Sequence, residues 1–354
     1  MIYLILLALT VVPLFLVEEQ WFSFKSNRKI ILILYSLAVA LLVGVAIIRA
    51  NDVGIDTPNY YRYFLGVRDE LFEVGYHFIT TLGQDYFGQF YLFKVFVTLV
   101  TLLSIAISMY WISSKKWLSL LLFQTLYLYG ASLSLFRQFL AIGLVMIGMV
   151  FLQHYFKQKS KLSYLMSIVM ILLGSLFHYS CATMLIIPIL ALVENRYKLV
   201  VSFIVLSFLL FVFKDTLISI VFNTLFKSRA YYASRAAIVG IVPVTQFILI
   251  FINQLLYRIK ATESEFEANK SQYYFVTNLS IVWASILVLY SWFPPLARLN
   301  LYIYVIMCAM LPQFMKYRKR TYILIVIVLV MFYLFTLLRR DYQSIWAYHT
   351  IFGG

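Results

Sequence analysis

Residues 117–156 read WLSLLLFQTLYLYGASLSLFRQFLAIGLVMIGMVFLQHYF and contain one charged residue, Arg137. Two apolar runs, Trp117–Phe136 and Phe139–Phe156, lie on either side of it. Each run is close to the about 20 residues that a helix needs to cross the hydrocarbon core of a bilayer. We therefore predict two membrane helices joined by a tight turn at 134–139. A cation in such a hairpin is costly at mid-membrane. The arrangement of the other spans decides how deep in the membrane Arg137 lies.

The composition of the whole chain agrees with a membrane location. Of 354 residues, 63% are hydrophobic and 12% are charged, whereas a soluble domain carries roughly 25% charged residues. We predict an all-α integral membrane protein that forms one polytopic domain over residues 1–354. The first apolar run has neither a basic leader nor a small-residue cleavage site, so we expect it to remain as a helix. Twelve predicted spans cover residues 2–17, 30–48, 92–112, 117–134, 138–156, 162–177, 179–193, 199–213, 242–258, 273–291, 299–315 and 321–338.

The loops between the predicted spans alternate between short loops rich in lysine and arginine and loops without this enrichment. Short basic loops mark the cytoplasmic side of a membrane protein, so both termini and two long loops, 49–91 and 214–241, are predicted to lie outside. The turn at Arg137 then lies at the outer interface, where a cation costs less than at mid-membrane. The basic loops contain Lys25, Arg28 and Lys29; Lys115 and Lys116; Lys157, Lys159 and Lys161; Arg196 and Lys198; Arg258, Lys260 and Lys270; and Lys316, Arg318, Lys319 and Arg320.

The remaining cations are mostly arginines on the predicted outer side. Arg137 and Arg298 lie at turns between spans, and Arg229 and Arg235 lie in the second long loop. A planar guanidinium binds phosphate or carboxylate in a bidentate geometry that lysine does not offer. Snorkelling to the interface is the alternative for Arg137, but the gathering of arginines on one side favours an anionic ligand. We expect the partner of Arg137 to be a ligand phosphate instead of a buried acidic residue, with Gln138 holding the guanidinium or a sugar hydroxyl.

The first long loop places carboxylates beside tyrosines. In GIDTPNYYRYF, residues 54–64, a short predicted helix follows Asp56 and carries Tyr60 and Tyr63 on one face, because positions three apart are neighbours on a helix. Asp56 is either a cap stabilised by the helix dipole or a carboxylate at the rim of a cavity. Glu73 and Tyr76 follow on a second helix, which we expect to lie at the membrane interface.

Two other outer features add polar and aromatic groups. Tyr232 lies between Arg229 and Arg235 in FKSRAYYASRAA, residues 226–237. Sugars stack on tyrosine rings, so this pattern suits a phosphorylated glycan, whereas an interfacial helix touching lipid phosphates is the alternative. Nucleic acid is excluded by the external position. His178, at another outer turn, is either a hydrogen-bonded structural residue or a proton acceptor.

Motifs for metal or nucleotide chemistry are missing from the sequence. It contains no His, Cys or Asp cluster with metal-ligand spacing, no phosphate-binding loop and no nucleophile elbow. Cys181 and Cys308 lie in apolar segments, so neither a disulfide framework nor a thiolate site is predicted. We predict no metal and no cofactor, and any group transfer must use an already activated donor.

Four elements, in the same order and spacing over about residues 45–195, resemble the EpsG-like branch of the Wzy polysaccharide polymerases. They are GIDTPNYYRYF, EVGYHFITTL, LFRQFLAIGLVMI and LLGSLFHYSCATMLIIPIL. The last departs from the family pattern by a cysteine before its alanine, and the first by the three residues between Asp56 and Tyr60. The resemblance implies a GT-C-like, metal-independent, inverting glycosyltransferase. It would act at the periplasmic face of the bacterial inner membrane, as a multi-pass protein.

The resemblance also implies a substrate and partners. The enzymes of this branch join undecaprenyl-pyrophosphate-linked repeat units into O-antigen, as in lipopolysaccharide, capsule or exopolysaccharide. The chain would then contact membrane lipid and work with a flippase and a chain-length-regulating co-polymerase.

Site roles follow from the same resemblance. Arg137, with Arg298 and either Arg229 or Arg235, would bind the pyrophosphate, and the catalytic proton acceptor would be Asp56, His178 or Glu73. The residues expected to bind the glycan are Tyr60, Tyr63, Glu73, Tyr76, Tyr232 and Gln138.

Three other classes of membrane protein compete with a polymerase. A flippase or transporter of lipid-linked glycans would also use an arginine-lined cavity, but transporters usually show related halves and midplane sites, and the halves of this sequence do not match. An O-antigen ligase would perform similar chemistry on a different acceptor. A scaffold protein has no need of two arginine-rich outer loops.

Overall fold

The computed structural model describes residues 2–20, 27–67, 72–193, 213, 254, 257–290, 297–315 and 319–338. Three of the described helices are long and apolar enough to cross a membrane by length and composition: α2 (Arg28–Ile47), α5 (Phe90–Ile112) and α8 (Phe136–Gln158). Shorter apolar helices accompany them, namely α1 (Ile2–Glu18), α9 (Lys161–Ser175), the 3-10 helix η1 (Tyr179–Leu185) with α10 (Ile186–Leu192), and α16 (Lys319–Leu338). The described part of the chain is therefore that of a helical membrane protein.

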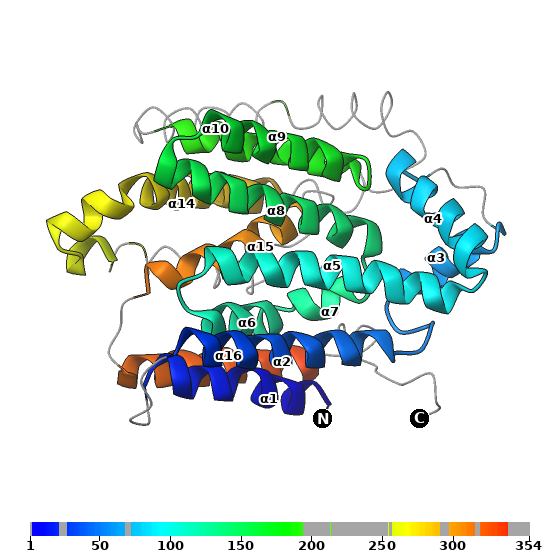
Figure 1. Cartoon of the computed structure of the whole chain (residues 1–354), viewed down its shortest axis with the longest axis horizontal. Helices are drawn as coiled ribbons and strands as arrows, with labels where there is room; N and C mark the ends of the chain where they lie inside the picture. The colour runs from blue at the N-terminus through cyan, green and yellow to red at the C-terminus, as the bar shows by residue number, and fades with distance from the viewer. Residues whose placement is uncertain are drawn as a thin grey trace.

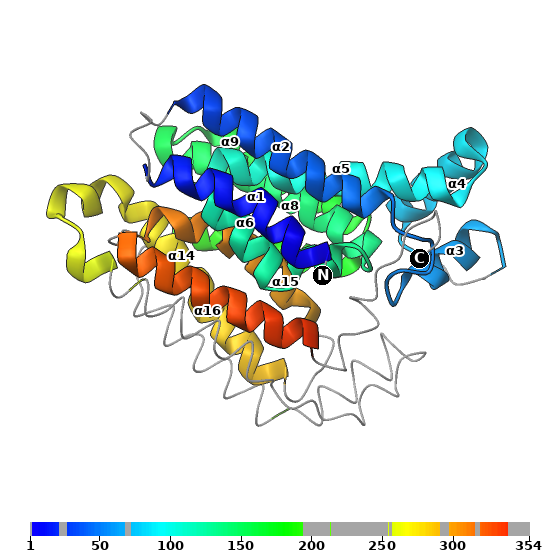
Figure 2. The ribbon, with the colours of Figure 1, turned by 90° about the horizontal axis from the view of Figure 1, so that it is seen from below.

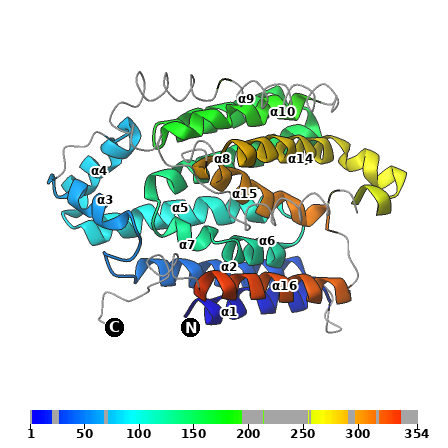
Figure 3. The ribbon, with the colours of Figure 1, turned by 180° about the vertical axis from the view of Figure 1, so that it is seen from behind.

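The helices form a bundle whose members run back and forth along one direction (Figure 1). α5 packs between α2 and α8, and α8 packs in turn against α9. α1 packs against α2 and against α6 (Lys116–Thr125). On another side of the bundle, α15 (Ala297–Met310) contacts α14 (Glu263–Tyr290), α6 and α8. α3 (Thr57–Phe64) and α4 (Val74–Phe87) lie at one end of the bundle in all three views (Figures 1, 2 and 3).

The apolar side chains of the bundle divide between a packed interior and an outward surface. Trp117, Trp283 and Tyr302 are fully buried in the main core. Large aliphatic side chains such as Ile33 on α2 and Leu165 on α9 are instead 59% and 54% exposed. A soluble monomer rarely exposes wide apolar surface, so these faces fit contact with lipid chains.

The predicted hairpin of residues 117–156 has its second arm as α8, and its first arm is interrupted. α8 begins at Phe136, two residues before the predicted start of the second span at 138, so Arg137 lies in the first turn of the helix. The predicted span 117–134 is not one helix, because α6 ends at Thr125 and a short α7 (Leu128–Ser132) follows. Between them Tyr127 has φ of 72°, a left-handed conformation that no helix continues through. The sequence prediction of a continuous span was wrong here.

Other predicted elements differ in detail or lie outside the described residues. The predicted span 179–193 begins as a 3-10 helix and becomes α-helical only at Ile186. The predicted span 199–213, except residue 213, most of 242–258, and the loop 214–241 lie outside the described part of the chain.

Among the described residues, the basic turns lie at the opposite end of the bundle from the turns before α8 and η1. α2, α6, α9 and α16 begin at the end where their basic residues were predicted to face the cytoplasm (Figure 1). The starts of α8 and η1 lie at the other end, near α3 and α4. Arg137 and His178 therefore share one end of the molecule.

Candidate functional site

An aromatic cluster fixes α3 and α4 against the start of α8. It consists of buried Tyr60, Phe64, Tyr76, Phe90, Phe93, Val97, Phe136 and Leu140. The ring of Tyr60 stacks on that of Phe136, with centroids 4.9 Å apart and planes at 11°. The predicted shared face of Tyr60 and Tyr63 is present, and Tyr63 packs on Phe72 with centroids 4.3 Å apart. Aromatic packing of this kind gives a rigid platform beside Arg137.

This packing changes the expectation for two of the tyrosines predicted to bind glycan. Tyr60 and Tyr76 are only 4% and 1% exposed, and neighbouring rings cover them. Neither ring offers an open face to a sugar in this structure, and the predicted role of these two tyrosines in binding glycan stays a prediction. Tyr63 is less buried, and its hydroxyl lies 2.7 Å from Nδ1 of His77.

A close backbone approach brings α4 against the end of α9. The backbone N–H of Gly75 donates to the carbonyl of Leu176 at 2.8 Å. A Cβ at Gly75 would lie 2.8 Å from that carbonyl oxygen, so only glycine allows the contact without displacement. Because Glu73 directly precedes α4 and His178 follows Leu176 by two residues, the contact places the two side chains together.

Glu73 is the centre of a buried charged cluster. Its Oε2 forms an ion pair with Nη1 of Arg137, and its Oε1 lies 3.0 Å from Nδ1 of His178. The backbone N–H of Tyr179 also donates to Oε1, at 3.4 Å. Glu73 is 3% exposed and His178 is 8% exposed. The expectation that Arg137 has no acidic protein partner was therefore wrong, because its partner lies 64 positions earlier in the chain.

The cluster sets the protonation states of Glu73 and His178. Burial alone would raise the pKa of Glu73, but the hydrogen bond from His178 and the charge of Arg137 lower that pKa to about 2. Burial lowers the pKa of His178, and the charges of Arg137 and Arg298 act in the same direction, against the raising effect of Glu73. His178 is thus neutral at neutral pH. Since an ionised carboxylate only accepts hydrogen bonds, Nδ1 carries the imidazole proton and Nε2 holds a lone pair.

Arg137 keeps hydrogen-bonding capacity beyond its pair with Glu73. Its guanidinium carbon lies 4.1 Å from the ring centroid of Phe72, a cation–π distance. Its Nε is buried and has no hydrogen-bond partner within the described residues, and the same holds for Oε1 of Gln138. Arg137 also stands in the first turn of α8, whose dipole favours an anion. These features make the start of α8 a place where an anionic ligand can bind.

The start of α15 lies beside the start of α8. Nε2 of Gln138 donates to the carbonyl of Arg298 at 2.6 Å, and the Arg298 side chain is exposed. The hydroxyls of Ser180 and Tyr302 lie 3.4 Å apart, which joins η1 to α15. Gln138 therefore positions the Arg298 backbone, a role that the sequence prediction of sugar or guanidinium binding did not include.

Asp56 lies on a neighbouring turn, outside the charged cluster. Its backbone N–H donates to Oγ of Ser134 at 3.2 Å. It stands at the N-cap of α3 without a side-chain capping bond. No ion pair or hydrogen bond joins its carboxylate to Arg137, Glu73 or His178 within the described residues.

The structure thus brings together part of the predicted site. Arg137, Glu73 and His178 are in direct contact, and Gln138 and Arg298 adjoin them. Arg229, Tyr232 and Arg235 lie outside the described residues. The sequence prediction missed Phe72, although an aromatic residue directly before Glu73 is visible in LFEVGY, residues 71–76.

One comparison with known proteins gives a match. A family model described as the EpsG family matches residues 32–350, which is most of the chain and includes the whole charged cluster. No curated protein and no solved structure matches the chain. The GT-C-like fold therefore stays a prediction.

Proposed function

The chain belongs to the EpsG family of Wzy-type polysaccharide polymerases, and from this premise we propose that it joins lipid-linked oligosaccharide repeat units into a surface polysaccharide. The donor is a growing glycan on undecaprenyl pyrophosphate, and the acceptor is a sugar hydroxyl of the next lipid-linked unit. The observation that carries the proposal is the contact of Arg137, Glu73 and His178 at one end of the bundle.

The position of this cluster supports a reaction at the outer face of the bacterial inner membrane. The cluster lies at the end of the bundle opposite the short basic turns (Figure 1), which by the distribution of lysine and arginine face the cytoplasm. A reaction there needs a donor that arrives already activated, and a sugar pyrophosphate meets that need.

His178 is assigned as the proton acceptor. The acceptor hydroxyl oxygen attacks the anomeric carbon of the donor, and its proton passes to Nε2 of His178. The bond between the anomeric carbon and the pyrophosphate oxygen breaks, and the pyrophosphate leaves with the electron pair. One in-line displacement of this kind inverts the anomeric configuration. A neutral imidazole held by a carboxylate is suited to this step.

Glu73 is assigned a positioning role for His178. A carboxyl group with a pKa of about 2 is a weak base at neutral pH, so Glu73 is poorly suited to take the proton itself. Its carboxylate instead orients the imidazole through Nδ1, as the third member of a catalytic triad does. Asp56 lacks contact with the cluster among the described residues and is assigned to the acceptor side of the site.

Arg137 is assigned to the leaving pyrophosphate. Negative charge develops on that group as the glycosidic bond breaks, and preplaced cations stabilise such charge most effectively. The buried Nε of Arg137 supplies a donor that Glu73 does not use. Arg298, together with Arg229 or Arg235, would complete the clamp without a metal ion.

A deletion strain tests this function. Loss of a polymerase leaves surface glycan capped with single repeat units, whereas loss of a flippase or a ligase leaves no surface glycan. The gel ladder of surface polysaccharide would be compared after complementation with wild type, Arg137→Ala and, as a matched control, Arg62→Ala on the exposed side of α3. We expect a ladder with wild type and Arg62→Ala and single units with Arg137→Ala. Complete loss of glycan in the deletion strain would overturn the proposal.

A further inference from the structure

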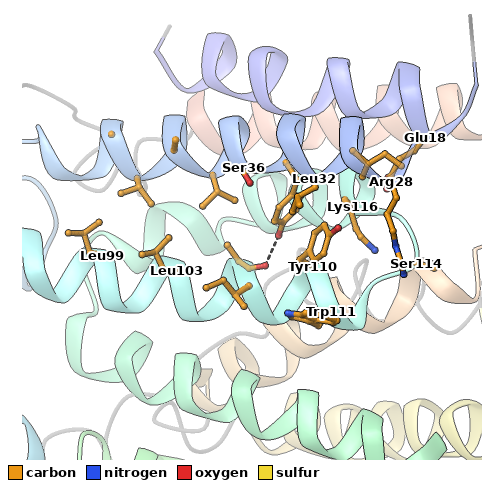
Figure 4. A pocket seen from close by; sticks show the side chains of 18 of the residues that line it. Glu18, Arg28, Leu32, Ser36, Leu99, Leu103, Tyr110, Trp111, Ser114 and Lys116 are labelled. Carbon is orange, nitrogen blue, oxygen red and sulfur yellow. Dashed lines mark hydrogen bonds between the residues drawn. The ribbon is translucent and has the colours of Figure 1, made fainter. Parts of the chain in front are cut away.

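A long groove runs between α2 and α5, away from the charged cluster. Its volume is about 1150 Å³. Leu32, Val39 and Val43 of α2 and Leu99, Leu103 and Ile107 of α5 line its length (Figure 4). α2 rises by about 28 Å between Arg28 and Ile47, so the groove extends across most of the hydrocarbon core of a bilayer, which is about 30 Å thick.

One end of the groove is strongly basic. Arg28, Lys116 and Lys157 line it there together with Glu18 and Ser114. Figure 4 shows Arg28, Lys116 and Ser114 gathered at this end, with Leu99 and Leu103 far along the groove. The same end is the one predicted to face the cytoplasm. A single carboxylate therefore faces three cations.

The Glu18 carboxylate interacts electrostatically with Lys116, and it is one negative charge against three positive charges. No ion pair within the described part of the chain includes Arg28, Lys116 or Lys157. Nζ of Lys116 donates to the carbonyl of Ser113 and lies 5.1 Å from the ring centroid of Tyr110. Oε2 of Glu18 accepts from the backbone N–H of Trp117 at 3.1 Å. The basic end is thus suited to a group with net negative charge.

The walls beyond the basic end are suited to hydrocarbon. The hydroxyl of Tyr35, one of the polar groups in the wall, donates to the carbonyl of Ala106 at 2.7 Å. Figure 4 shows this bond as the dashed line within the groove. Beyond Ser36, the lining residues from Val39 to Ile47 and from Leu99 to Leu103 are apolar.

From this combination we propose that the groove binds an anionic phospholipid of the cytoplasmic leaflet. Its phosphate headgroup lies among Arg28, Lys116 and Lys157, and an acyl chain follows the α2–α5 wall. Charge complementarity selects the headgroup, because each lysine or arginine near the surface favours an anionic lipid by about fivefold in affinity. The site is separate from the proposed catalytic cluster and does not depend on the proposed function.

Trp111 allows the site to be measured directly. It lines the basic end of the groove and is 67% exposed. The purified full chain would be placed in vesicles of phosphatidylglycerol and phosphatidylcholine, with one or the other lipid brominated on its acyl chains. The brominated lipid quenches tryptophan fluorescence. The part of this quenching that is present in wild type and lost in Trp111→Phe reports the lipid in the groove. We expect phosphatidylglycerol to be preferred at least about fivefold over phosphatidylcholine.

Two pairs of variants separate the site from general surface charge. The first is a triple variant that carries Arg28→Gln, Lys116→Gln and Lys157→Gln. It should reduce the preference for phosphatidylglycerol over phosphatidylcholine to about one. The matched triple variant carries Lys29→Gln, Lys159→Gln and Lys161→Gln and removes the same charge outside the groove lining. It should leave the lipid preference intact. Ser36→Phe, which fills the groove and keeps every charge, should weaken quenching at Trp111, and Leu37→Phe on the exposed side of α2 should not.

Equal quenching by the two lipids in wild type would overturn the proposal. An equal loss of preference in both triple variants would also overturn it, because the selectivity would then be a property of the whole basic surface. If the first triple variant does not fold, the comparison of Ser36→Phe with Leu37→Phe decides alone.

Discussion

Glu73 and Arg137 form a buried ion pair although 64 positions separate them in the chain. The same carboxylate accepts a hydrogen bond from His178. One acidic residue therefore fixes both the cation and the imidazole of the candidate site. A buried charge that loses its partner is strongly destabilising, so the three residues should respond to substitution as a unit.

The first prediction concerns Arg137→Lys. Lysine keeps the charge but lacks the planar fork of the guanidinium, so it cannot present one edge to Glu73 and separate N–H donors to a pyrophosphate in the same fixed geometry. We expect polymerisation to fall about 100-fold or more, measured as the rate of polymer formation from lipid-linked repeat units by the purified protein. Arg62→Lys serves as the matched control. A normal rate at normal expression in Arg137→Lys would rule out the clamp.

The second prediction concerns Glu73→Gln. This change leaves the Arg137 guanidinium buried without a counter-charge, which should cost about 3–5 kcal/mol of the free energy of unfolding. Thermal unfolding in detergent would show the loss. The double variant Glu73→Gln with Arg137→Met should recover much of the stability, because no unpaired charge remains, but none of the activity. If Glu73→Gln unfolds like wild type, the buried pair is not a stabilising contact.

The third prediction is the pH dependence of the reaction. The pKa of His178 lies below its ordinary value of 6.5, and the active form is the neutral one. Activity should therefore be constant above about pH 6.5 and fall as the pH is lowered through the pKa of His178. Glu73, with a pKa of about 2, stays ionised over this range and adds no second step.

A His178→Gln variant checks this assignment. It should lose about 100-fold or more in rate, and its residual activity should not fall with acidification as that of wild type does. Asp56→Asn is the comparison. A larger loss in Asp56→Asn than in His178→Gln, with the acid limb also gone, would transfer the role of base to Asp56.

The fourth prediction concerns Gly75→Ala. The added methyl group would lie 2.8 Å from the Leu176 carbonyl oxygen, so α4 must move away from α9 and carry Glu73 from His178. We expect a loss of about 100-fold in rate, the usual effect of a displacement of about 1 Å at a catalytic group. Gly44→Ala is the matched control, because a Cβ there meets nothing within 4 Å. Equal rates in the two variants would contradict the positioning argument.

The fifth prediction concerns Phe72, which the sequence did not identify. Phe72→Leu removes the ring 4.1 Å from the Arg137 guanidinium but keeps an apolar side chain. A cation–π contact contributes about 0.5–2 kcal/mol, so the rate should fall by about 2- to 30-fold. Phe72→Tyr should retain the wild-type rate, and a loss in Phe72→Tyr as large as in Phe72→Leu would exclude the ring contact.

The amino-acid sequence determined the class and family of this protein by itself. The apolar runs predicted a helical membrane protein because a bilayer requires long apolar helices whose backbone groups are bonded internally. Motifs around Arg137 and His178 led to the family that the comparison confirmed. The basic turns also predicted correctly that Arg137 and His178 lie at the same end of the bundle, where both contact Glu73. These features depend on local composition and spacing, which a sequence states directly.

Only the tertiary structure decided which side chains meet. Glu73, 64 positions from Arg137 and 105 from His178, reaches both because Gly75 lets α4 approach the end of α9. The left-handed Tyr127 that divides the predicted span 117–134 has no signal in its apolar surroundings. Burial of Tyr60 and Tyr76 likewise follows from the packing of α3 and α4 on α8. Hydropathy sets how deep a helix lies in the membrane, but contacts between helices depend on side-chain shape and on close backbone approaches.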